Sequence, residues 1–225
     1  SGNPAANGEN AATNTAAYLQ VDKKLLARLM VSAGVRYERF KVNELEQAEP
    51  VVRAGATYQV WEGTFLRASY GQGFRFPTIG ERYIITSVGA LHIYPNPELK
   101  PETSVNMECG IKQGFKLGGV SGYMDMVAFQ QDFDRYVEFT FGQWGRDRSP
   151  ANLLGFGFKS SNTGGARVTG TEFELAGKGV VGVVELRFLL GYTHTLPVST
   201  TPNEAYAQTV STTGAVQNVT YLSTS

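Results

Sequence analysis

The chain has 225 residues, of which 42% are apolar, so it is long enough for one large or two small domains. Its 20 basic and 20 acidic residues cancel and are spread along the chain. No basic block interleaved with aromatic residues is present, which excludes the usual pattern of a nucleic-acid-binding protein. Glycine (26 residues) and aromatic residues (12%) are plentiful. Together with the scarcity of long helix-forming stretches, this composition indicates an all-β protein with many turns.

Reactive and metal-binding side chains are few. The single cysteine, Cys109, excludes an intramolecular disulfide framework, and its place in an alternating run predicts a small apolar filler. His92 and His194 lie far apart without ligand-like spacing, so we expect no metal site. No glycine-flanked serine forms a nucleophile elbow. The sequence therefore predicts no catalytic residues, no cofactor and no enzyme activity.

The two ends of the chain look like loops. Residues 1–15 are rich in Ala and Asn, and the stretch from 200 onward is rich in Thr and Ser and has no closing element. We interpret the chain as a fragment. The most apolar stretch, 180–192, is interrupted by Glu185 and Arg187, which argues against a membrane-spanning helix.

The hydrophobic pattern predicts about eight strands, near 15–22, 25–40, 51–60, 64–73, 103–115, 119–132, 165–177 and 181–195. In the third, Val52, Ala54 and Tyr58 share one face, while Arg53 and Thr57 share the other. Residues 25–33 also fit one stripe of a helix. We prefer a strand there because the alternation continues through residues 35–42, where a helical stripe would stop.

The connections between these strands alternate between short and long. Tight turns are expected at 22–24, 61–63, 116–119 and 178–182, and long connections at 41–50, 74–102, 133–164 and from 196 onward. Because consecutive antiparallel strands reverse direction, all tight turns would lie at one end of the sheet. Outer-membrane barrels have this asymmetry, and strands of ten or more residues can cross a bilayer at a tilt. A soluble β-sandwich binding module remains an alternative, since alternation alone does not exclude it.

The predicted fold is therefore all-β: a segment of an antiparallel, up-and-down transmembrane β-barrel, with about eight long strands of a larger barrel. Two motifs flank its longest early connection. The first, Gly73-Phe-Arg-Phe-Pro77, follows a strand that can bend at its glycines. The second, Asn96-Pro-Glu-Leu-Lys-Pro-Glu102, leads into the next strand, and its prolines lack the amide that ladder pairing needs. We expect eight residues to shape the barrel rim without binding a ligand: Phe74, Arg75, Pro77, Asn96, Pro97, Leu99, Pro101 and Glu102.

This pair of motifs resembles a signature in the barrel of TonB-dependent receptors, and the resemblance continues through 110–115, 122–125 and 162–172. It covers about two thirds of the chain in the family's order, and its style is similar to receptors of the Bacteroidetes type. The resemblance implies that residues 1–225 are a late part of a roughly 22-stranded barrel around an N-terminal plug. Neither a plug nor the closing C-terminal strands are recognisable here. The tight turns would be periplasmic and the proline-rich rim external.

The resemblance further implies a receptor of the Gram-negative outer membrane that actively imports a scarce large solute, such as a siderophore, cobalamin or a glycan. The expected partners are outer-membrane lipid, the TonB energy-coupling system acting through the plug, a surface lipoprotein, and a small-molecule or oligomeric substrate. The fragment alone would not transport. A passive outer-membrane porin or channel is the alternative, and an outer-membrane adhesin is a further one.

Ligand contacts are predicted from loop aromatics and arginines, which suit catecholates, glycans or peptides about equally. Phe139 and Phe141 fit an aromatic girdle, or a strand that extends past the membrane, better than a ligand site. The candidates for ligand binding are Arg82, Tyr83, Trp144 and Arg146. The substrate itself is not specified by these residues.

Overall fold

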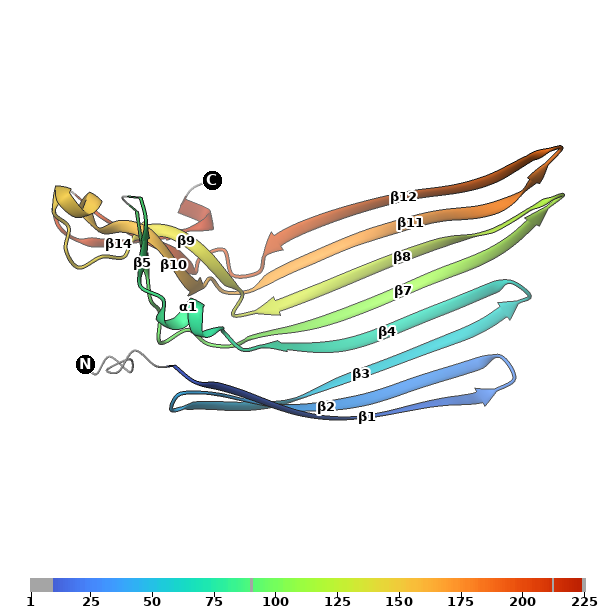
Figure 1. Ribbon diagram of the computed structural model, residues 1–225, viewed down its shortest axis with the longest axis horizontal. Helices are drawn as coiled ribbons and strands as arrows, with labels where there is room; N and C mark the ends of the chain where they lie inside the picture. Colours follow the sequence, from blue (N-terminus) through green and yellow to red (C-terminus); the bar gives the residue numbers. More distant parts are fainter. Residues whose placement is uncertain (1–9, 90, 212, 224–225) are drawn as a thin grey trace.

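The computed structural model describes residues 10–89, 91–211 and 213–223. Its largest part is an antiparallel sheet of eight strands in the order β1-β2-β3-β4-β7-β8-β11-β12, called the wall below. The strands are β1 (Ala12–Leu26), β2 (Leu29–Val42), β3 (Leu45–Trp61), β4 (Thr64–Arg75), β7 (Glu102–Leu117), β8 (Val120–Asp134), β11 (Ala166–Val181) and β12 (Val184–Ser199). Figure 1 shows these long strands side by side, with β1 and β12 as the two open edges. The prediction of eight long antiparallel strands is confirmed.

The two faces of the wall differ in polarity, as the period of two requires. Cross-strand pairing forms rows such as Ala54–Tyr70–Met107 on one face and Gly55–Ser69–Glu108 on the other. Large apolar side chains on the first face remain open, for example Tyr58 (43% exposed), Leu66 (45%) and Met126 (48%). Such a broad apolar surface suits contact with lipid, and the polar face suits water.

Four tight turns close the wall at one end, seen on the right of Figure 1. They lie at 27–28, 62–63, 118–119 and 182–183. Gly63 has φ 78°, a left-handed conformation that glycine adopts without steric cost. The last three turns fall where the sequence predicts them. The turn predicted at 22–24 is wrong, because Asp22, Lys23 and Lys24 continue β1 and pair with β2.

The long connection predicted at 41–50 is also wrong. Strands β2 and β3 run on as a hairpin, and only Asn43 and Glu44 join them. Asn43 has φ 53°, a left-handed conformation that asparagine tolerates better than most residues. At the chain start, Ala12 to Thr15 belong to β1 and not to a loop, while residues 1–9 lie outside the described residues.

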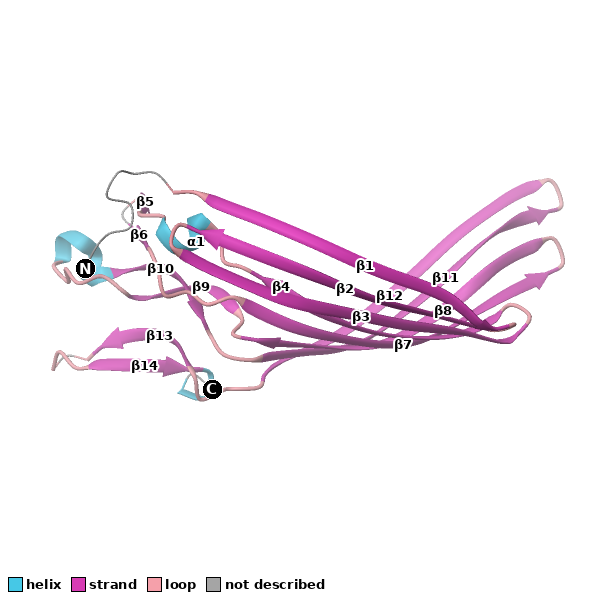
Figure 2. Ribbon diagram, turned by 90° about the horizontal axis from the view of Figure 1, so that it is seen from below, coloured by secondary structure: helices cyan, strands magenta, loops and turns pink. Residues whose placement is uncertain are grey.

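The other long connections fold into a separate layer at the opposite end from the four turns (Figure 2). This layer, made of the described residues within 76–101, 135–165 and 200–223, is called the roof below. It contains α1 (Ile79–Tyr83), β5 (Thr86–Val88), β6 (Leu91–Tyr94), β9 (Val137–Gln143), the 3₁₀ helix η1 (Pro150–Gly155), β10 (Phe156–Asn162), β13 (Ala205–Val210), β14 (Val216–Thr220) and η2 (Tyr221–Ser223). Strands β5-β6-β10-β9 form a second sheet, and β13-β14 form a hairpin. Within the described ranges, no helix is long and apolar enough to cross a membrane.

The hydrophobic core lies at the junction of wall and roof and not within the wall. The most buried apolar side chains among the described residues include Leu99 (1% exposed), Val42 (2%) and Phe76 (6%), and Pro77 is also fully buried. Phe76 stacks on Phe40 of β2 with ring centroids 5.5 Å apart. The wall has one layer and cannot bury its own faces, so tight packing begins only where the loops fold over its end.

Candidate functional site

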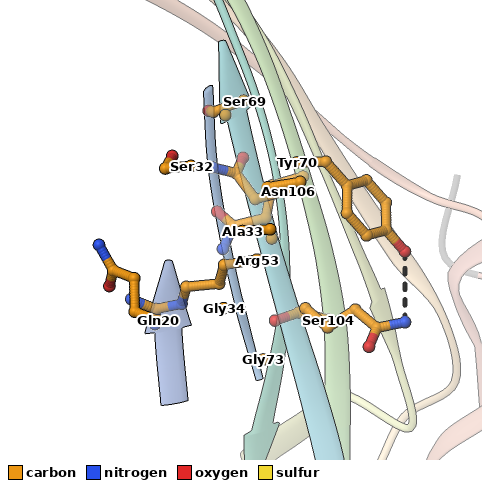
Figure 3. A pocket seen from close by; sticks show the side chains of 15 residues that line it. Gln20, Ser32, Ala33, Gly34, Arg53, Ser69, Tyr70, Gly73, Ser104 and Asn106 are labelled. Atoms are coloured by element: carbon orange, nitrogen blue, oxygen red, sulfur yellow. Dashed lines mark hydrogen bonds between the residues drawn. The ribbon is translucent and has the colours of Figure 1, made fainter. Parts of the chain in front are cut away.

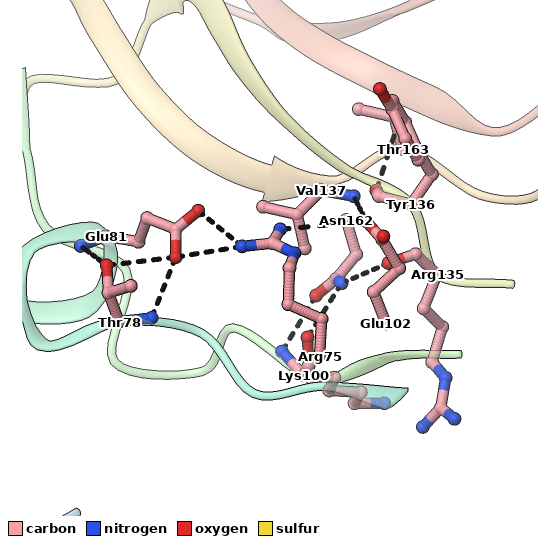
Figure 4. Close-up of polar contacts among 10 residues, drawn as sticks. All are labelled: Arg75, Thr78, Glu81, Lys100, Glu102, Arg135, Tyr136, Val137, Asn162 and Thr163. Atoms are coloured by element: carbon pink, nitrogen blue, oxygen red, sulfur yellow. Dashed lines mark hydrogen bonds and ion pairs between the residues drawn. The ribbon is translucent and has the colours of Figure 1, made fainter. Parts of the chain in front are cut away.

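The first motif ends β4 with an arginine that contacts two carboxylates. Arg75 Nη1 donates to Glu81 Oε1 at 3.0 Å, and its Nη2 lies 3.6 Å from Glu102 Oε2 (Figure 4). Glu81 is held in place by a capping box at the start of α1, in which Thr78 N donates to Glu81 Oε2 and Glu81 N donates to Thr78 Oγ1. Partial burial opposes ionisation of Glu81, but the bonds from Thr78 and Arg75 prevail and hold its pKa below the usual range.

The second motif is anchored by the arginine of the helix. Arg82 Nη1 donates to the carbonyl oxygen of Leu99 at 2.6 Å, and its Nη2 donates to the carbonyl oxygen of Pro97. The side chain is only 5% exposed. Arg82 was predicted as a ligand contact, but the structure uses its guanidinium to satisfy two backbone carbonyls. It positions the loop and is not open to a solute.

A third set of hydrogen bonds joins the connection 76–101 to the connection 135–165. Asn96 Nδ2 donates to the carbonyl of Ser160, and Glu102 Oε2 accepts from the amide of Val137, both at 2.9 Å. Asn162 both accepts from Lys100 N and donates to Lys100 O, and it also donates to Arg135 O. Figure 4 shows Asn162 between these two backbone segments. Asn162 opened one of the motifs noted in the sequence, but its role as a link was not predicted.

These contacts bring the predicted rim residues together. The group formed by Arg75, Phe76, Pro77, Arg82, Asn96, Leu99, Glu102 and Asn162 is called the rim cluster below. Its polar members hold backbone atoms and each other, and its apolar members are buried. The rim cluster fixes how the roof sits on the wall.

The remaining predicted ligand contacts lie apart from the cluster's bonds. Tyr83 is half-buried, with the guanidinium carbon of Arg82 5.5 Å from its ring centroid. Trp144 is half-buried, and Nζ of Lys159 lies 5.1 Å from its ring centroid. Burial lowers the pKa of Lys159. Arg146 is exposed. Of these candidates, Arg146 is thus the most open to a solute.

Phe139 and Phe141 lie on β9 in the roof sheet. Phe139 stacks on Phe158 at 5.0 Å, and Phe141 stacks on Phe156 at 5.7 Å. Their side chains are 55% and 49% exposed. They therefore form an aromatic surface on β9, outside the wall.

The polar face of the wall carries a shallow trough of about 550 Å³. Figure 3 shows its lining of small polar side chains around Arg53, with Ser32, Ser69, Ser104 and Asn106 among them. Four glycines, 34, 55, 71 and 73, keep the surface low along its strands. Closer to the tight turns the same face carries charged groups, including an ion pair of 2.8 Å between Arg67 and Asp125.

Comparison with known proteins identifies the chain. The family model described as "TonB dependent receptor-like, beta-barrel" matches residues 1–223. The chain belongs to the TonB-dependent receptor family. Its members are proteins of the Gram-negative outer membrane, so the wall is a piece of an outer-membrane barrel and the resemblance seen in the sequence is confirmed.

Two curated relatives align with part of the chain. The vitamin B12 transporter BtuB of Vibrio vulnificus is 27% identical over 150 residues, which are 66% of this chain and 22% of that protein. Hemoglobin and hemoglobin-haptoglobin-binding protein A of Haemophilus influenzae is 30% identical over 125 residues, 55% of this chain and 11% of that protein. The matched part of the chain thus spans about a fifth of the first relative and about a tenth of the second.

Solved structures of the family share the fold. The Serratia marcescens hemophore receptor HasR matches 82% of this chain with a TM-score of 0.70 and 18% identity, and this covers 34% of HasR. The Pseudomonas aeruginosa siderophore receptor PirA matches 84% of this chain with a TM-score of 0.67 and 19% identity, which covers 35% of PirA. In TonB-dependent barrels of this kind, the apolar face of the wall meets lipid and the polar face lines the lumen.

Proposed function

We propose that the protein containing this chain is an outer-membrane receptor that imports a scarce large solute, such as a siderophore, cobalamin or a glycan, with energy from the TonB system. The family match over residues 1–223 is the observation that carries this proposal. The names of the relatives and neighbours, which include a vitamin B12 transporter and a siderophore receptor, support two of these solutes.

The geometry of the wall supports the proposal. Its polar face is wide and hollowed, as a lumen surface that admits a large solute would be, and the structured roof can form a vestibule above it. Eight strands with two open edges would leave unpaired backbone groups in lipid. The chain would therefore act only within a complete barrel and would not transport on its own.

The proposed partners follow from this role. They are outer-membrane lipid on the apolar face, a TonB-type coupling protein acting through a plug, a surface lipoprotein, and a small or oligomeric solute. The pattern of charge along the chain gives no reason to add a nucleic acid.

We propose no enzyme activity for this chain. Ser87 Oγ and His92 Nδ1 lie 2.9 Å apart in the roof, which is the distance of a nucleophile and its base. Nucleophilic catalysis also needs a group that orients the histidine and donors for an oxyanion. Among the contacts of the described residues, none gives His92 a carboxylate partner. We therefore interpret the pair as a bond between β5 and β6.

The test is energy-dependent uptake. Bacteria expressing the whole receptor would be grown on a limiting solute, in strains with and without the inner-membrane coupling protein. The proposal expects growth to require both proteins, and it expects the purified receptor to be closed in planar bilayers. Uptake that persists without the coupling protein, with continuous conductance in the bilayer, would instead establish a passive channel.

A further inference from the structure

A cavity of about 570 Å³ lies where the roof meets the late strands of the wall. The ends of β8, β11 and β12 that lie next to the roof form its floor, and the start of β9 and η2 form its side. Phe133 and Val168 of the floor belong to rows that continue the polar, lumenal face, since Phe133 pairs with Ser104 and Val168 pairs with Gln131. The cavity therefore opens toward the path that a solute would take through the barrel.

The walls of this cavity are mostly apolar and aromatic. Phe133 and Tyr136 meet edge to face with ring centroids 5.3 Å apart. Tyr221 stands opposite on η2, and its other side is stacked on Tyr206 at 4.7 Å. The backbone of Tyr136 is held in place, because its amide donates to Gly164 O and its carbonyl accepts from Thr163 N. Figure 4 shows Tyr136 beside Thr163. Rigid aromatic walls of this kind suit a ligand with a flat apolar face.

One carboxylate lies in the lining. Glu138 Oε2 accepts a hydrogen bond of 2.7 Å from the phenol of Tyr221. Burial and this bond raise the pKa of Tyr221 to about 12, so its proton stays in place at physiological pH and points at Glu138. A carboxylate has several lone-pair sites, so Glu138 can still accept further hydrogen bonds.

No basic side chain balances this carboxylate among the described residues that line the cavity. The arginines that adjoin lining residues in the sequence are paired elsewhere: Arg135 Nε lies 3.1 Å from Asp134 Oδ2, and Arg167 Nε lies 2.5 Å from Asp132 Oδ1. An anionic ligand would thus meet a negative group with no positive partner, which costs free energy in a partly buried site.

We propose that this cavity binds a neutral solute that has a flat apolar face and a rim of hydrogen-bond donors, as a sugar ring has, and that it rejects anionic metal chelates. The inference rests on the proposed import function and names the solute class for it. Aromatic faces would cover the apolar side of the ring, while Glu138 would accept from its hydroxyl or amide donors.

An adjoining cleft of about 710 Å³ extends the site along β9. It shares Tyr136, Glu138 and Tyr221 with the cavity and adds Phe139, Phe141 and Tyr206. Glu138 lies at the boundary of the two spaces, whereas Phe139 and Phe141 alternate with it along β9 and face the other side of the strand. The cleft could therefore hold a part of the solute that extends past the edge of β9.

Binding by the whole receptor in detergent tests the inference, with three probes: maltoheptaose, cyanocobalamin and ferric enterobactin. The first two probes are neutral and rich in hydrogen-bond donors. Comparing them shows whether the site prefers hydroxyl donors or amide donors. Ferric enterobactin is anionic. The variant is Glu138→Gln, which keeps the shape and can still accept from Tyr221. The control is Glu44→Gln, which removes an exposed glutamate at the same end of the wall.

We expect at least one neutral probe to bind and Glu138→Gln to weaken it about tenfold, because a charge-assisted bond becomes a neutral one. Tyr136→Leu should also weaken it about tenfold, whereas Tyr37→Leu on the apolar face of the wall should not. Ferric enterobactin should bind weakly and should gain affinity in Glu138→Gln. Glu138→Gln is thus expected to change the affinity for neutral and for anionic probes in opposite directions, which separates the two solute classes.

The inference is overturned if no neutral probe binds, if Glu138→Gln leaves neutral binding unchanged, or if only the anionic chelate binds. The proposed import function fails separately, by uptake without the coupling protein. Tight chelate binding with coupled uptake would therefore reject the solute class and keep the function.

Discussion

In the wall, Arg67 and Asp125 form an ion pair of 2.8 Å with side chains that are 40% and 13% exposed. At the rim, Arg82 is 5% exposed and donates to two backbone carbonyls. The two arginines make comparable contacts in different surroundings. Water can replace the partner of Arg67, but it cannot easily reach the carbonyls that Arg82 satisfies.

Apolar residues show the same contrast. Leu99 is 1% exposed in the rim cluster, whereas Leu66 is 45% exposed on the apolar face of the wall. The wall is held by ladder hydrogen bonds and by lipid outside it, so single side chains have few neighbours to lose. The rim cluster is packed like a small protein core. Side-chain changes should therefore matter most where the roof is fixed to the wall.

The largest expected effect is that of Leu99→Ala. Removing a fully buried leucine leaves a cavity and should destabilise the roof by about 3 kcal/mol. Limited proteolysis of the whole receptor in detergent would measure this as much faster cleavage within residues 76–101. Leu66→Ala is the matched control and should cost about 1 kcal/mol or less. Equal effects of the two changes would refute the contrast between rim and wall.

The next effect in size is that of Arg82→Ala. It leaves the carbonyls of Leu99 and Pro97 without their donor and should cost about 2 kcal/mol. Hydrogen exchange of the amides in 96–101 would report the loosening. Arg146→Ala removes an exposed arginine of the roof and should leave the same amides unchanged. If both variants exchange like the wild type, Arg82 does not position the loop.

The wall could be predicted from the sequence because its pattern has a strict period. Errors came where that pattern ends. Asp22 to Lys24 are polar, so the pattern predicts a turn there, but they continue β1 at the end of the wall with the tight turns. Residues 41–50 are rich in charge and contain Pro50, yet they form the tip of the β2–β3 hairpin. Beyond the apolar band both faces of a strand can be polar, so alternation no longer marks it.

The roof was harder to predict because its contacts join residues far apart in the chain. Arg82 carries the same charge as Arg146, and only the positions of Pro97 and Leu99, 15 and 17 residues later, decide that it is buried. The Asn162–Lys100 bonds span 62 residues. The motifs indicated which residues belong to the rim, but their partners depend on how two loops fold against each other. The cavity beside Glu138 depends on η2, which no sequence pattern predicted.

A smaller effect should appear on acidification of the rim. The pKa of Glu81 is lowered in the folded state, so its contribution to stability is present above the unfolded value of about 4.5 and is lost as the pH falls through the folded value. Proteolysis of residues 76–101 by an acid-active protease should accelerate as the pH falls from about 6 to about 3.5, a range that spans the unfolded value. Glu81→Gln should be cleaved faster at pH 6 and should show a flatter dependence. A wild-type profile as flat as that of the variant would contradict this role.

The smallest expected effect is that of Arg67→Gln in the wall. The pair with Asp125 faces the lumen and is partly exposed, so its loss should cost less than about 1 kcal/mol. Lys112 Nζ lies 3.9 Å from the same Asp125 oxygen and can partly replace the lost charge. Urea denaturation of the receptor refolded in lipid would measure the change, and high salt should abolish most of it. A loss of stability as large as that caused by Arg82→Ala would mean that the lumenal face excludes water as well as the rim does. The distinction between the two regions would then fail.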